Sequence, residues 1–436
     1  MTRYSKNDFR IARAARALLL LLGVDMLAAC EFKVTNPGPV PSENLDNRAT
    51  AAGIVNGAGR DLSDALNWIA YTGGAISREV FPAGSTGSFG ISAQQQVGKL
   101  LDDDTNNYWQ LAQRARFEGE DGARHLKNSL GPSFAQDTLG AKILIWSGYA
   151  NRLLGENMCD AVIDGGSKQA STVYLTRADS ELTEALSIAT AVNSTKFINV
   201  ARAARAAVRL DLGKVPEAVA DANTITDSFV YAMTYFVTDQ DQYNRIFWAT
   251  ANQPYRAHTV WNTVNDQYYT DTKDPRVPWA SDPLQPVGDA AVLSLGRVTW
   301  HKEMKFAKQD APINLSSGWE MRLIEAEAAL IGNDLTTAMT LINKHRVALA
   351  LQPWPASTLD DGWTALRRER GIELWLEGRR LNDLHRWNIA SRPGTLSPLE
   401  QPGAGTNGAP SYLTQQDLCF PIPTSEKQNN PNLAGS

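Results

Sequence analysis

The sequence has few cysteines, few histidines and no excess of positive charge. Its 436 residues include three Cys and five His, and 42 Lys and Arg stand against 47 Asp and Glu. Three cysteines are too few for a small disulfide-stabilised scaffold, and so few Cys and His argue against a zinc site. The net charge of −5 argues against non-specific nucleic-acid binding, which needs a basic surface opposite the phosphates. We therefore expect no metal site and no nucleic-acid partner.

Common enzyme motifs are missing as well. The sequence contains no HExxH motif and no recognisable Ser/His/Asp set. A hydrophobic content of 43% with 20% charged residues is ordinary for a globular protein with a buried core and excludes disorder throughout the chain. We expect a globular protein that is not an enzyme and needs no cofactor.

The first residues have the pattern of an export signal. Five basic residues precede a short apolar run at 17–24, and the small residues 28 and 29 stand directly before Cys30. This order is typical of a bacterial lipoprotein signal, in which cleavage precedes a cysteine that is then acylated. A membrane-spanning helix needs about 18 or more apolar residues, and Asp25 ends the run well before that length. A simple secretory signal remains the alternative.

These features divide the chain into three predicted parts. We predict a signal peptide at 1–29, a lipidated tether at 30–48 and a single body at 49–436. The tether contains a Thr-Asn-Pro-Gly-Pro-Val-Pro run, which cannot continue a helix or a central strand. Such a spacer would hold the body away from a membrane to which Cys30 is anchored.

Two cysteines, Cys159 and Cys419, remain if Cys30 carries lipid. An even remainder in an exported protein favours a disulfide. This bridge would close a long loop, with a stabilisation of up to about 5 kcal/mol in the chain-entropy model. Two unpaired buried thiols are the alternative.

Helical patterns dominate the body, which predicts a mainly α fold. Apolar residues recur at three- and four-residue spacing over 200–212, and Gly213 would end that helix before a second one begins. The same order of helix, glycine and alanine-containing helix recurs at Gly155 and Gly332. Each unit resembles a tetratricopeptide helix hairpin, although their unequal spacing does not fit a regular array with a period of about 34 residues.

Two segments depart from this simple helical pattern. Residues 234–297 are rich in Asn, Asp, Pro and aromatics and show no helical period, which predicts loops and short strands laid over the helical scaffold. A long charged helix is predicted at about 362–387. Along it, Arg370 with Glu373 and Arg379 with Asp383 are spaced to form ion pairs on one face.

Four segments of the sequence resemble the SusD/RagB family. Residues 369–387 read ERGIELWLEGRRLNDLHRW and fill every position of the family's signature helix, namely Glu-Arg, Glu, Glu-Gly-x-Arg and Asp-Leu-x-Arg-Trp. The segments 274–276, 321–328 and 420–433 match further family landmarks in the same order. With the lipoprotein signal, the resemblance spans nearly the whole mature chain.

The resemblance implies a lipid-anchored protein on the surface of the bacterial outer membrane. Proteins of this family are α-helical, with tetratricopeptide-like hairpins packed against a more irregular, loop-rich ligand-binding part. They cover a SusC-like TonB-dependent transporter and capture nutrients for import, most often oligosaccharides. The matching motifs are structural in the family, so the resemblance implies the role and leaves the ligand open.

The 12 tryptophans are the remaining unusual feature. A sugar ring offers an apolar face, so a saccharide site often presents a flat aromatic ring beside polar side chains. Two segments with this composition suggest ligand contact at Trp68, Tyr71, Trp261, Tyr268 and Tyr269. Core packing is the alternative for each of them, and it is our prediction for Trp109, Trp146, Trp375 and Trp387, which lie in helical patterns.

Two other functions fit parts of the sequence. A surface glycoside hydrolase is one, because helical toroids also carry carboxylate pairs between aromatic walls, and turnover of an oligosaccharide would identify it. A helical-repeat adaptor for another protein is the other, and it would bind that protein without any small ligand.

Overall fold

The computed structural model describes residues 42–252, 255–403 and 411–433, and the chain divides into two units at Leu45. In the first unit the described element is the short helix η1 (Ser42–Leu45). The predicted signal at 1–29, the predicted lipidation site Cys30 and the predicted tether up to residue 41 lie outside the described residues. Within the described part of the chain, no helix combines the length and apolar character needed to span a bilayer. The second unit begins at Asp46 and contains all the other described elements.

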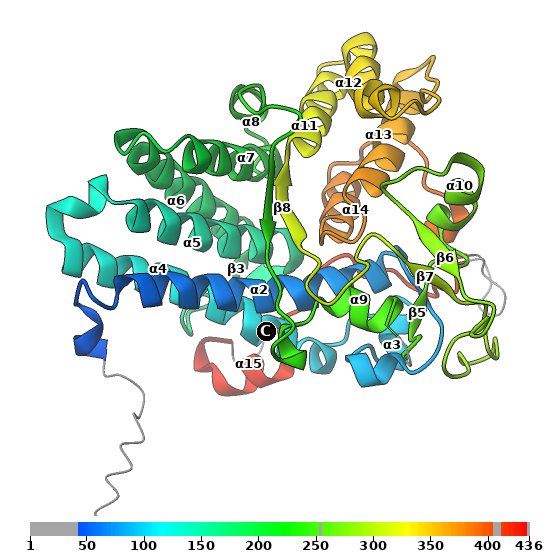
Figure 1. The fold of residues 1–436 in the computed structure, drawn as a ribbon, viewed down its shortest axis with the longest axis horizontal. Helices are drawn as coiled ribbons and strands as arrows, with labels where there is room; N and C mark the ends of the chain where they lie inside the picture. The colour runs from blue at the N-terminus through cyan, green and yellow to red at the C-terminus, as the bar shows by residue number, and fades with distance from the viewer. Residues whose placement is uncertain (1–41, 253–254, 404–410, 434–436) are drawn as a thin grey trace, which may run out of the picture. The chain divides into compact units, whose positions relative to one another are not determined.

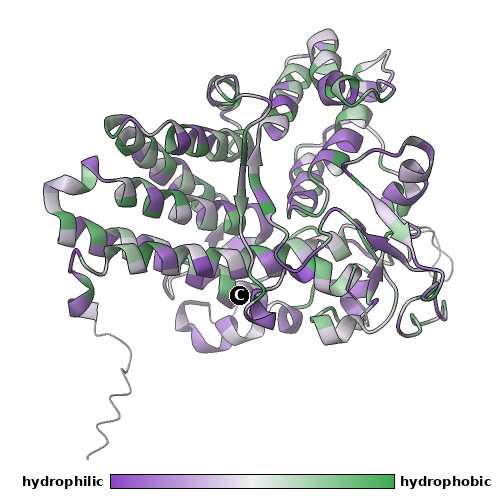
Figure 2. Ribbon diagram, viewed as in Figure 1, coloured by the Kyte–Doolittle hydropathy of each residue, from purple (hydrophilic) through white to green (hydrophobic). Residues whose placement is uncertain are grey.

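Five long helices of this unit lie side by side (Figure 1). They are α2 (Ala51–Ile76), α4 (Asn106–Leu130), α5 (Thr138–Asn157), α6 (Thr172–Ala191) and α7 (Thr195–Asp211). Figure 2 shows apolar and polar residues alternating around these helices, as expected when one face of a helix is buried. The mainly α-helical prediction is confirmed. Trp109, Trp146, Trp375 and Trp387 are all buried, as predicted.

Two of the three predicted helix hairpins form as expected. Helix α7 is followed by α8 (Val215–Ala222), and α11 (Gly318–Ile331) by α12 (Leu335–Ala348). The first connection uses Gly213 in the left-handed region (φ 72°), whereas the second uses Asn333 (φ 62°), directly after Gly332. Both residue types tolerate this conformation, so each helix can turn back within three residues.

The prediction of a glycine stop at Gly155 is wrong. Gly155 lies inside α5, which continues to Asn157, and the turn to α6 contains the short strands β2 (Asp160–Ala161) and β3 (Gln169–Ala170). A Cβ atom at position 155 would lie 2.6 Å from Cγ of Leu175 on α6. The glycine therefore permits the close approach of α5 and α6, and it has no role in ending the helix.

We predict that Gly155→Ala lowers the free energy of unfolding by about 1 to 3 kcal/mol, because the added methyl group overpacks the interface with Leu175. Gly57→Ala in α2 is the matched control, since nothing lies within 4 Å of a Cβ atom there. Alanine at this exposed position should stabilise the helix by about 0.5 to 1 kcal/mol. Urea unfolding measures both, and equal stabilisation by the two substitutions would contradict the close-packing role.

The segment at 234–297 is loop-rich with short strands, as predicted, but it also contains two helices. These are α9 (Arg245–Thr250) and α10 (Val264–Thr272). The expectation of no helix here is wrong because local caps start both: the side chains of Asn244 and Thr263 accept hydrogen bonds from the first turns.

Short antiparallel strand pairs lie in and next to this segment. The pairs are β1 (Phe81–Pro82) with β5 (His258–Thr259), β4 (Val230–Met233) with β8 (Ile313–Ser317), and β6 (Trp279–Ser281) with β7 (His301–Glu303). The other described elements are η2 (Thr86–Phe89), α3 (Ala93–Gln96), η3 (Asp102–Asp104), η4 (Gly131–Gln136), η5 (Gln240–Gln242), η6 (Pro398–Glu400), α15 (Thr424–Asn429) and η7 (Pro431–Leu433).

The predicted continuous helix at 362–387 is two helices, α13 (Leu359–Glu373) and α14 (Arg380–Ile389). A tight turn separates them, with Leu376 and Gly378 in the left-handed region (φ 59° and 75°). The turn places Trp375 and Leu376 against Glu79, where Trp375 Nε1 donates to the Glu79 carbonyl and Leu376 N to its carboxylate. Hydrogen bonds with a residue far away in the chain thus stabilise the break between the two helices.

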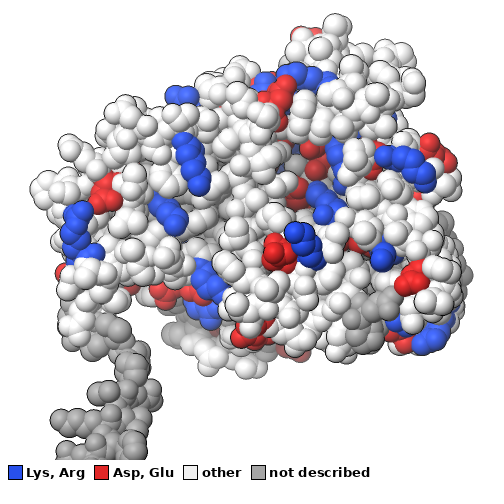
Figure 3. Space-filling model, viewed as in Figure 1, with Lys and Arg blue, Asp and Glu red and all other residues white. Residues whose placement is uncertain are grey.

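The predicted ion pairs along the single helix are also wrong. Arg370 pairs with Asp383 across the turn, with both N–O distances at 2.8 Å, and Arg379 pairs with Glu156 on α5 at 2.8 Å. These charges are buried and hold different elements together. On the surface, Figure 3 shows acidic and basic side chains intermixed on the face in view.

The predicted disulfide between Cys159 and Cys419 is confirmed, with their Cα atoms 5.0 Å apart. Cys159 N donates to the Phe420 carbonyl at 3.0 Å, and Phe420 N donates to the Asn157 carbonyl at 2.8 Å. The bridge and these hydrogen bonds attach the C-terminal segment to the end of α5.

Candidate functional site

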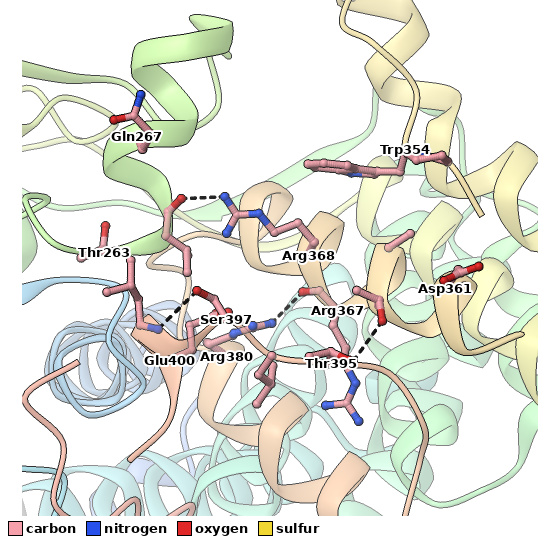
Figure 4. Close-up of a pocket in the computed structure, with 16 residues that line it drawn as sticks. Thr263, Gln267, Trp354, Asp361, Arg367, Arg368, Arg380, Thr395, Ser397 and Glu400 are labelled. Carbon is pink, nitrogen blue, oxygen red and sulfur yellow. Dashed lines mark hydrogen bonds and ion pairs between the residues drawn. The ribbon is translucent and has the colours of Figure 1, made fainter. Parts of the chain in front are cut away.

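A cavity of about 630 Å³ lies between α10, α13 and the segment that contains η6 (Figure 4). Its volume is within the range of small-molecule binding sites. The apolar part of its wall consists of Val264, Trp354, Pro355, Ala365, Leu396 and Leu399. The polar part consists of Thr263, Gln267, Asp361, Thr364, Arg367, Arg368, Arg380, Thr395, Ser397 and Glu400. The cavity can therefore take a ligand with both apolar and polar faces.

Trp354 lies in the connection between α12 and α13 and is held in a defined orientation. Its backbone N–H donates to Asn343 Oδ1 at 2.7 Å, and Asn343 Nδ2 donates back to its carbonyl at 3.1 Å. The indole Nε1 donates to Glu369 Oε2 at 2.7 Å. With three hydrogen bonds fixing backbone and ring, the indole is pre-organised at the cavity wall.

Tyr268 supports Trp354. The two rings stack with centroids 5.9 Å apart and 29° between their planes, and the Arg346 guanidinium lies 4.0 Å from the indole centroid. The Tyr268 hydroxyl donates to Asp274 Oδ2 at 2.7 Å and accepts from Arg346 at 2.8 Å. Tyr268 itself is not among the residues that line the cavity, so the structure gives it a positioning role next to Trp354.

Three arginines approach the cavity in different ways (Figure 4). Arg380 pairs with Glu400 at 2.5 Å, and Arg367 donates to the carbonyls of Pro393 and Arg392 at 3.1 and 2.8 Å. Arg368 donates from Nη2 to the Val264 carbonyl at 2.6 Å. Burial lowers the pKa of both Arg367 and Arg368; Arg380 lowers both further, whereas the negative charge of Glu400 opposes the shift at Arg368.

Both carboxylates of the cavity wall are engaged in structural contacts. Asp361 accepts hydrogen bonds from the Ser357 backbone and hydroxyl and from Thr358 at the start of α13. These bonds lower the pKa of Asp361 to about 2, whereas a general acid needs a pKa near the working pH. Glu400 is paired with Arg380. In the described ranges no cluster of three or more His, Cys, Asp or Glu is arranged to hold a metal ion.

Tyr71 is fully buried. Its side chain is 0% exposed, and its hydroxyl is 2.9 Å from His258 Nδ1. Trp68, one turn earlier on α2, is half-buried, and the Arg245 guanidinium lies 3.2 Å from its ring centroid. Arg245 also approaches the Tyr71 ring. The first predicted cluster is thus largely packed inside the protein, because α9 covers this face of α2.

Trp261 and Tyr269 lie away from the cavity wall. Trp261 packs edge-on against Phe81, with centroids 5.5 Å apart, and Tyr269 packs against Trp279 at 5.9 Å. The five predicted residues therefore occupy separate places, with only Tyr268 next to the cavity. Ligand contact by these five residues, Trp68, Tyr71, Trp261, Tyr268 and Tyr269, stays a prediction.

The sequence analysis missed Trp354 and Arg368. One signal was present for Trp354, because Pro353 and Pro355 flank it, and prolines on both sides restrict the backbone and interrupt any helix. Arg368 directly precedes the signature segment and has no distinguishing pattern of its own. Its place in the site depends on the fold, which brings α13 within hydrogen-bond reach of α10.

Residues 319–434 match the sequence model of the SusD family. The fold is similar to that of a SusD superfamily protein from Bacteroides vulgatus, with 15% identity, a TM-score of 0.61 and coverage of 89% of this chain and 98% of that chain. A SusD-like carbohydrate binding protein from the same organism has 18% identity and a TM-score of 0.62, with coverage of 89% and 97%.

A SusD superfamily protein from Parabacteroides distasonis has 13% identity and a TM-score of 0.65, with coverage of 88% and 98%. At these identities the similarities establish the fold. No curated protein matches the chain by sequence.

Proposed function

We propose that this chain, a protein of the SusD/RagB family, captures oligosaccharides at the bacterial surface and delivers them to a SusC-like TonB-dependent transporter. The observation that carries the proposal is the cavity whose wall presents Trp354 beside amide, hydroxyl and guanidinium groups. A solved protein of the same fold is described as carbohydrate binding, which supports the same class of ligand here.

The cavity has the chemistry that a sugar ring requires. The indole of Trp354 offers an apolar surface for the C–H face of a sugar, while Gln267, Thr395 and Ser397 offer hydrogen-bonding groups for its hydroxyls. Figure 4 shows the Trp354 ring extending over the cavity toward Arg368. Because hydrogen bonds already hold the ring, binding would require little ordering of this side chain.

We propose binding without hydrolysis. Both carboxylates at the cavity wall have structural partners, and Asp361 has a pKa of about 2. A glycoside hydrolase needs one carboxylic acid that is protonated near neutral pH and a second carboxylate opposite it. The contacts of Asp361 and Glu400 favour the binding role over the hydrolytic alternative.

The same role explains the predicted N-terminal features. A signal at 1–29, lipid on Cys30 and the tether would place the body at the outer surface of the outer membrane. Co-purification of the full chain with an outer-membrane transporter from native membranes tests the partnership. Recovery of the chain with a different protein partner and no glycan binding would instead favour the adaptor alternative.

We expect Trp354→Ala to weaken binding of a glycan by about tenfold or more, since loss of an aromatic stacking partner and its apolar area removes about 1.5 kcal/mol or more. A glycan array identifies a bound oligosaccharide, and isothermal titration calorimetry measures its affinity. Trp354→Phe should recover part of the affinity.

Phe117→Ala is the matched control, because Phe117 is a large aromatic on α4 that is 48% exposed and does not line the cavity. Its affinity should equal that of the wild type. If Trp354→Ala bound the glycan with unchanged affinity, the glycan site would lie somewhere other than this cavity.

A further inference from the structure

We propose that this cavity selects ligands that carry an anionic group, a carboxylate or a sulfate, and that Arg368 binds that group. The inference rests on the proposed glycan capture and names the ligand class: acidic oligosaccharides, which carry uronic acid or sulfated units.

The charges at the cavity wall leave an excess of positive charge. Three arginines and two carboxylates line it. Glu400 is neutralised by Arg380, and Asp361 is held by the N–H groups at the start of α13. Neither carboxylate is within ion-pair distance of Arg367 or Arg368 in the described structure. An anionic ligand would therefore meet two guanidinium groups that lack a carboxylate partner.

Arg368 is the better placed of these two. Arg367 is buried and uses both Nε and Nη2 to bond the carbonyls of Pro393 and Arg392. Arg368 makes one hydrogen bond, from Nη2 to the Val264 carbonyl, and its guanidinium lies 5.0 Å from the Tyr268 centroid. A guanidinium has five N–H donors, so within the described part of the protein Arg368 keeps donors available to a ligand in the cavity.

Two buried arginines near Arg368 each have a carboxylate partner, which Arg368 lacks within the described residues. Arg370, two residues later, binds Asp383 through two hydrogen bonds of 2.8 Å, and Arg380 binds Glu400. A partly buried cation without an ion-pair partner is unfavourable, and a carboxylate or sulfate matches the geometry of a guanidinium. A ligand anion can supply the partner that the chain supplies to Arg370 and Arg380.

The hydrogen bond to the Val264 carbonyl fixes the position of the Arg368 guanidinium at the cavity. Val264 begins α10 and lines the cavity, so its carbonyl holds Arg368 across the gap between α10 and α13 (Figure 4). Trp354 lines the same cavity. A stacked sugar ring would thus have a fixed cation nearby, which suits an acidic substituent on that ring or on the next unit.

A purely structural role is the alternative, in which Arg368 only ties α13 to α10. That role would make Arg368→Gln less stable but would leave the choice between acidic and neutral glycans unchanged. The two roles therefore differ in selectivity, and selectivity can be measured on folded protein.

The test begins with a glycan array that contains acidic and neutral oligosaccharides, applied to the wild-type chain. The acidic glycan with the strongest signal is then compared by isothermal titration calorimetry with its carboxyl-reduced or desulfated counterpart, which keeps the remaining structure. We expect the wild type to bind the acidic form at least about tenfold more tightly than its counterpart, because hydrogen bonds between charged groups contribute that much binding free energy. The difference should shrink as the salt concentration rises.

Arg368→Gln should reduce this preference to less than about twofold, and Arg368→Lys should restore part of it because it keeps the charge but not the planar fork. Arg124→Gln, at a side chain that is 52% exposed on α4, should keep the full preference. Circular dichroism establishes that each variant is folded before its selectivity is measured.

The outcomes separate this inference from the proposed function. Binding of neutral glycans only, or a preference that survives in folded Arg368→Gln, would overturn the inference and leave glycan capture standing. Absence of binding to every glycan on the array would overturn both.

Discussion

Arg379→Met is expected to lower the free energy of unfolding by about 3 to 5 kcal/mol, because it removes one partner from a buried ion-pair network. Arg379 donates from Nη1 to Glu156 at 2.8 Å and from Nη2 to the Leu315 carbonyl at 2.9 Å. Arg152 binds the same Glu156 and also Glu320, at 2.5 and 2.7 Å. All four charged side chains are at most 5% exposed. Without Arg379, two carboxylates would share one arginine.

The position of this network explains the size of the effect. It joins α5, β8, the start of α11 and the turn between α13 and α14. Removal of Arg379 leaves an uncompensated negative charge where these elements meet, and water cannot readily solvate it. Guanidinium-induced or thermal unfolding measures the loss.

Arg48→Met is the matched control, since the Arg48 side chain is 71% exposed and its ion pair with Asp137 is 3.4 Å long. Exposed pairs contribute about 0 to 1 kcal/mol. A deficit below about 1 kcal/mol would contradict the importance of charge pairing here.

Replacing Cys159 and Cys419 together by alanine is expected to lower the free energy of unfolding by about 2 to 5 kcal/mol. The bridge joins residues that are 260 positions apart, so its loss enlarges the conformational freedom of the unfolded chain considerably. In the folded state, the C-terminal segment would keep its hydrogen bonds to Asn157 and Cys159 and the packing of Phe420 against Tyr108. We therefore expect a folded but less stable protein.

Reduction of the wild-type body without Cys30 provides the control for this prediction. Under reducing conditions its stability should fall to that of the double variant, whose own stability should not respond to the reductant. Intact-mass measurement should show a deficit of two protons in the oxidised wild type. Two alkylatable thiols in the native, unreduced protein would rule out the bridge.

The helical scaffold was predictable where the determining contacts are local. The stripe of apolar residues over 200–212 and the following Gly213 describe α7 and its turn correctly, because helix periodicity and a left-handed stop are properties of neighbouring residues. The break at Leu376 was not predictable in this way. It is stabilised by Glu79, 296 residues before Trp375, and the local sequence favours a continuous charged helix.

The candidate site was less accessible to prediction for a related reason. Composition drew attention to Tyr268, which lies beside the cavity, but it could not distinguish an aromatic ring on a wall from one inside the core. Tyr71 is covered by its contact with His258, 187 residues later. Arg368 meets Val264 only because the fold brings α13 within hydrogen-bond reach of α10.

By itself, the sequence determined the helical class, two of the hairpins, the family resemblance and, from the cysteine count, the disulfide. These features depend on local periodicity, on a contiguous signature and on the elimination of other partners. Only the tertiary structure decided which charges are paired and which aromatic faces are open. Both depend on what lies opposite each side chain, and in this protein the opposite residue is usually far away in the chain.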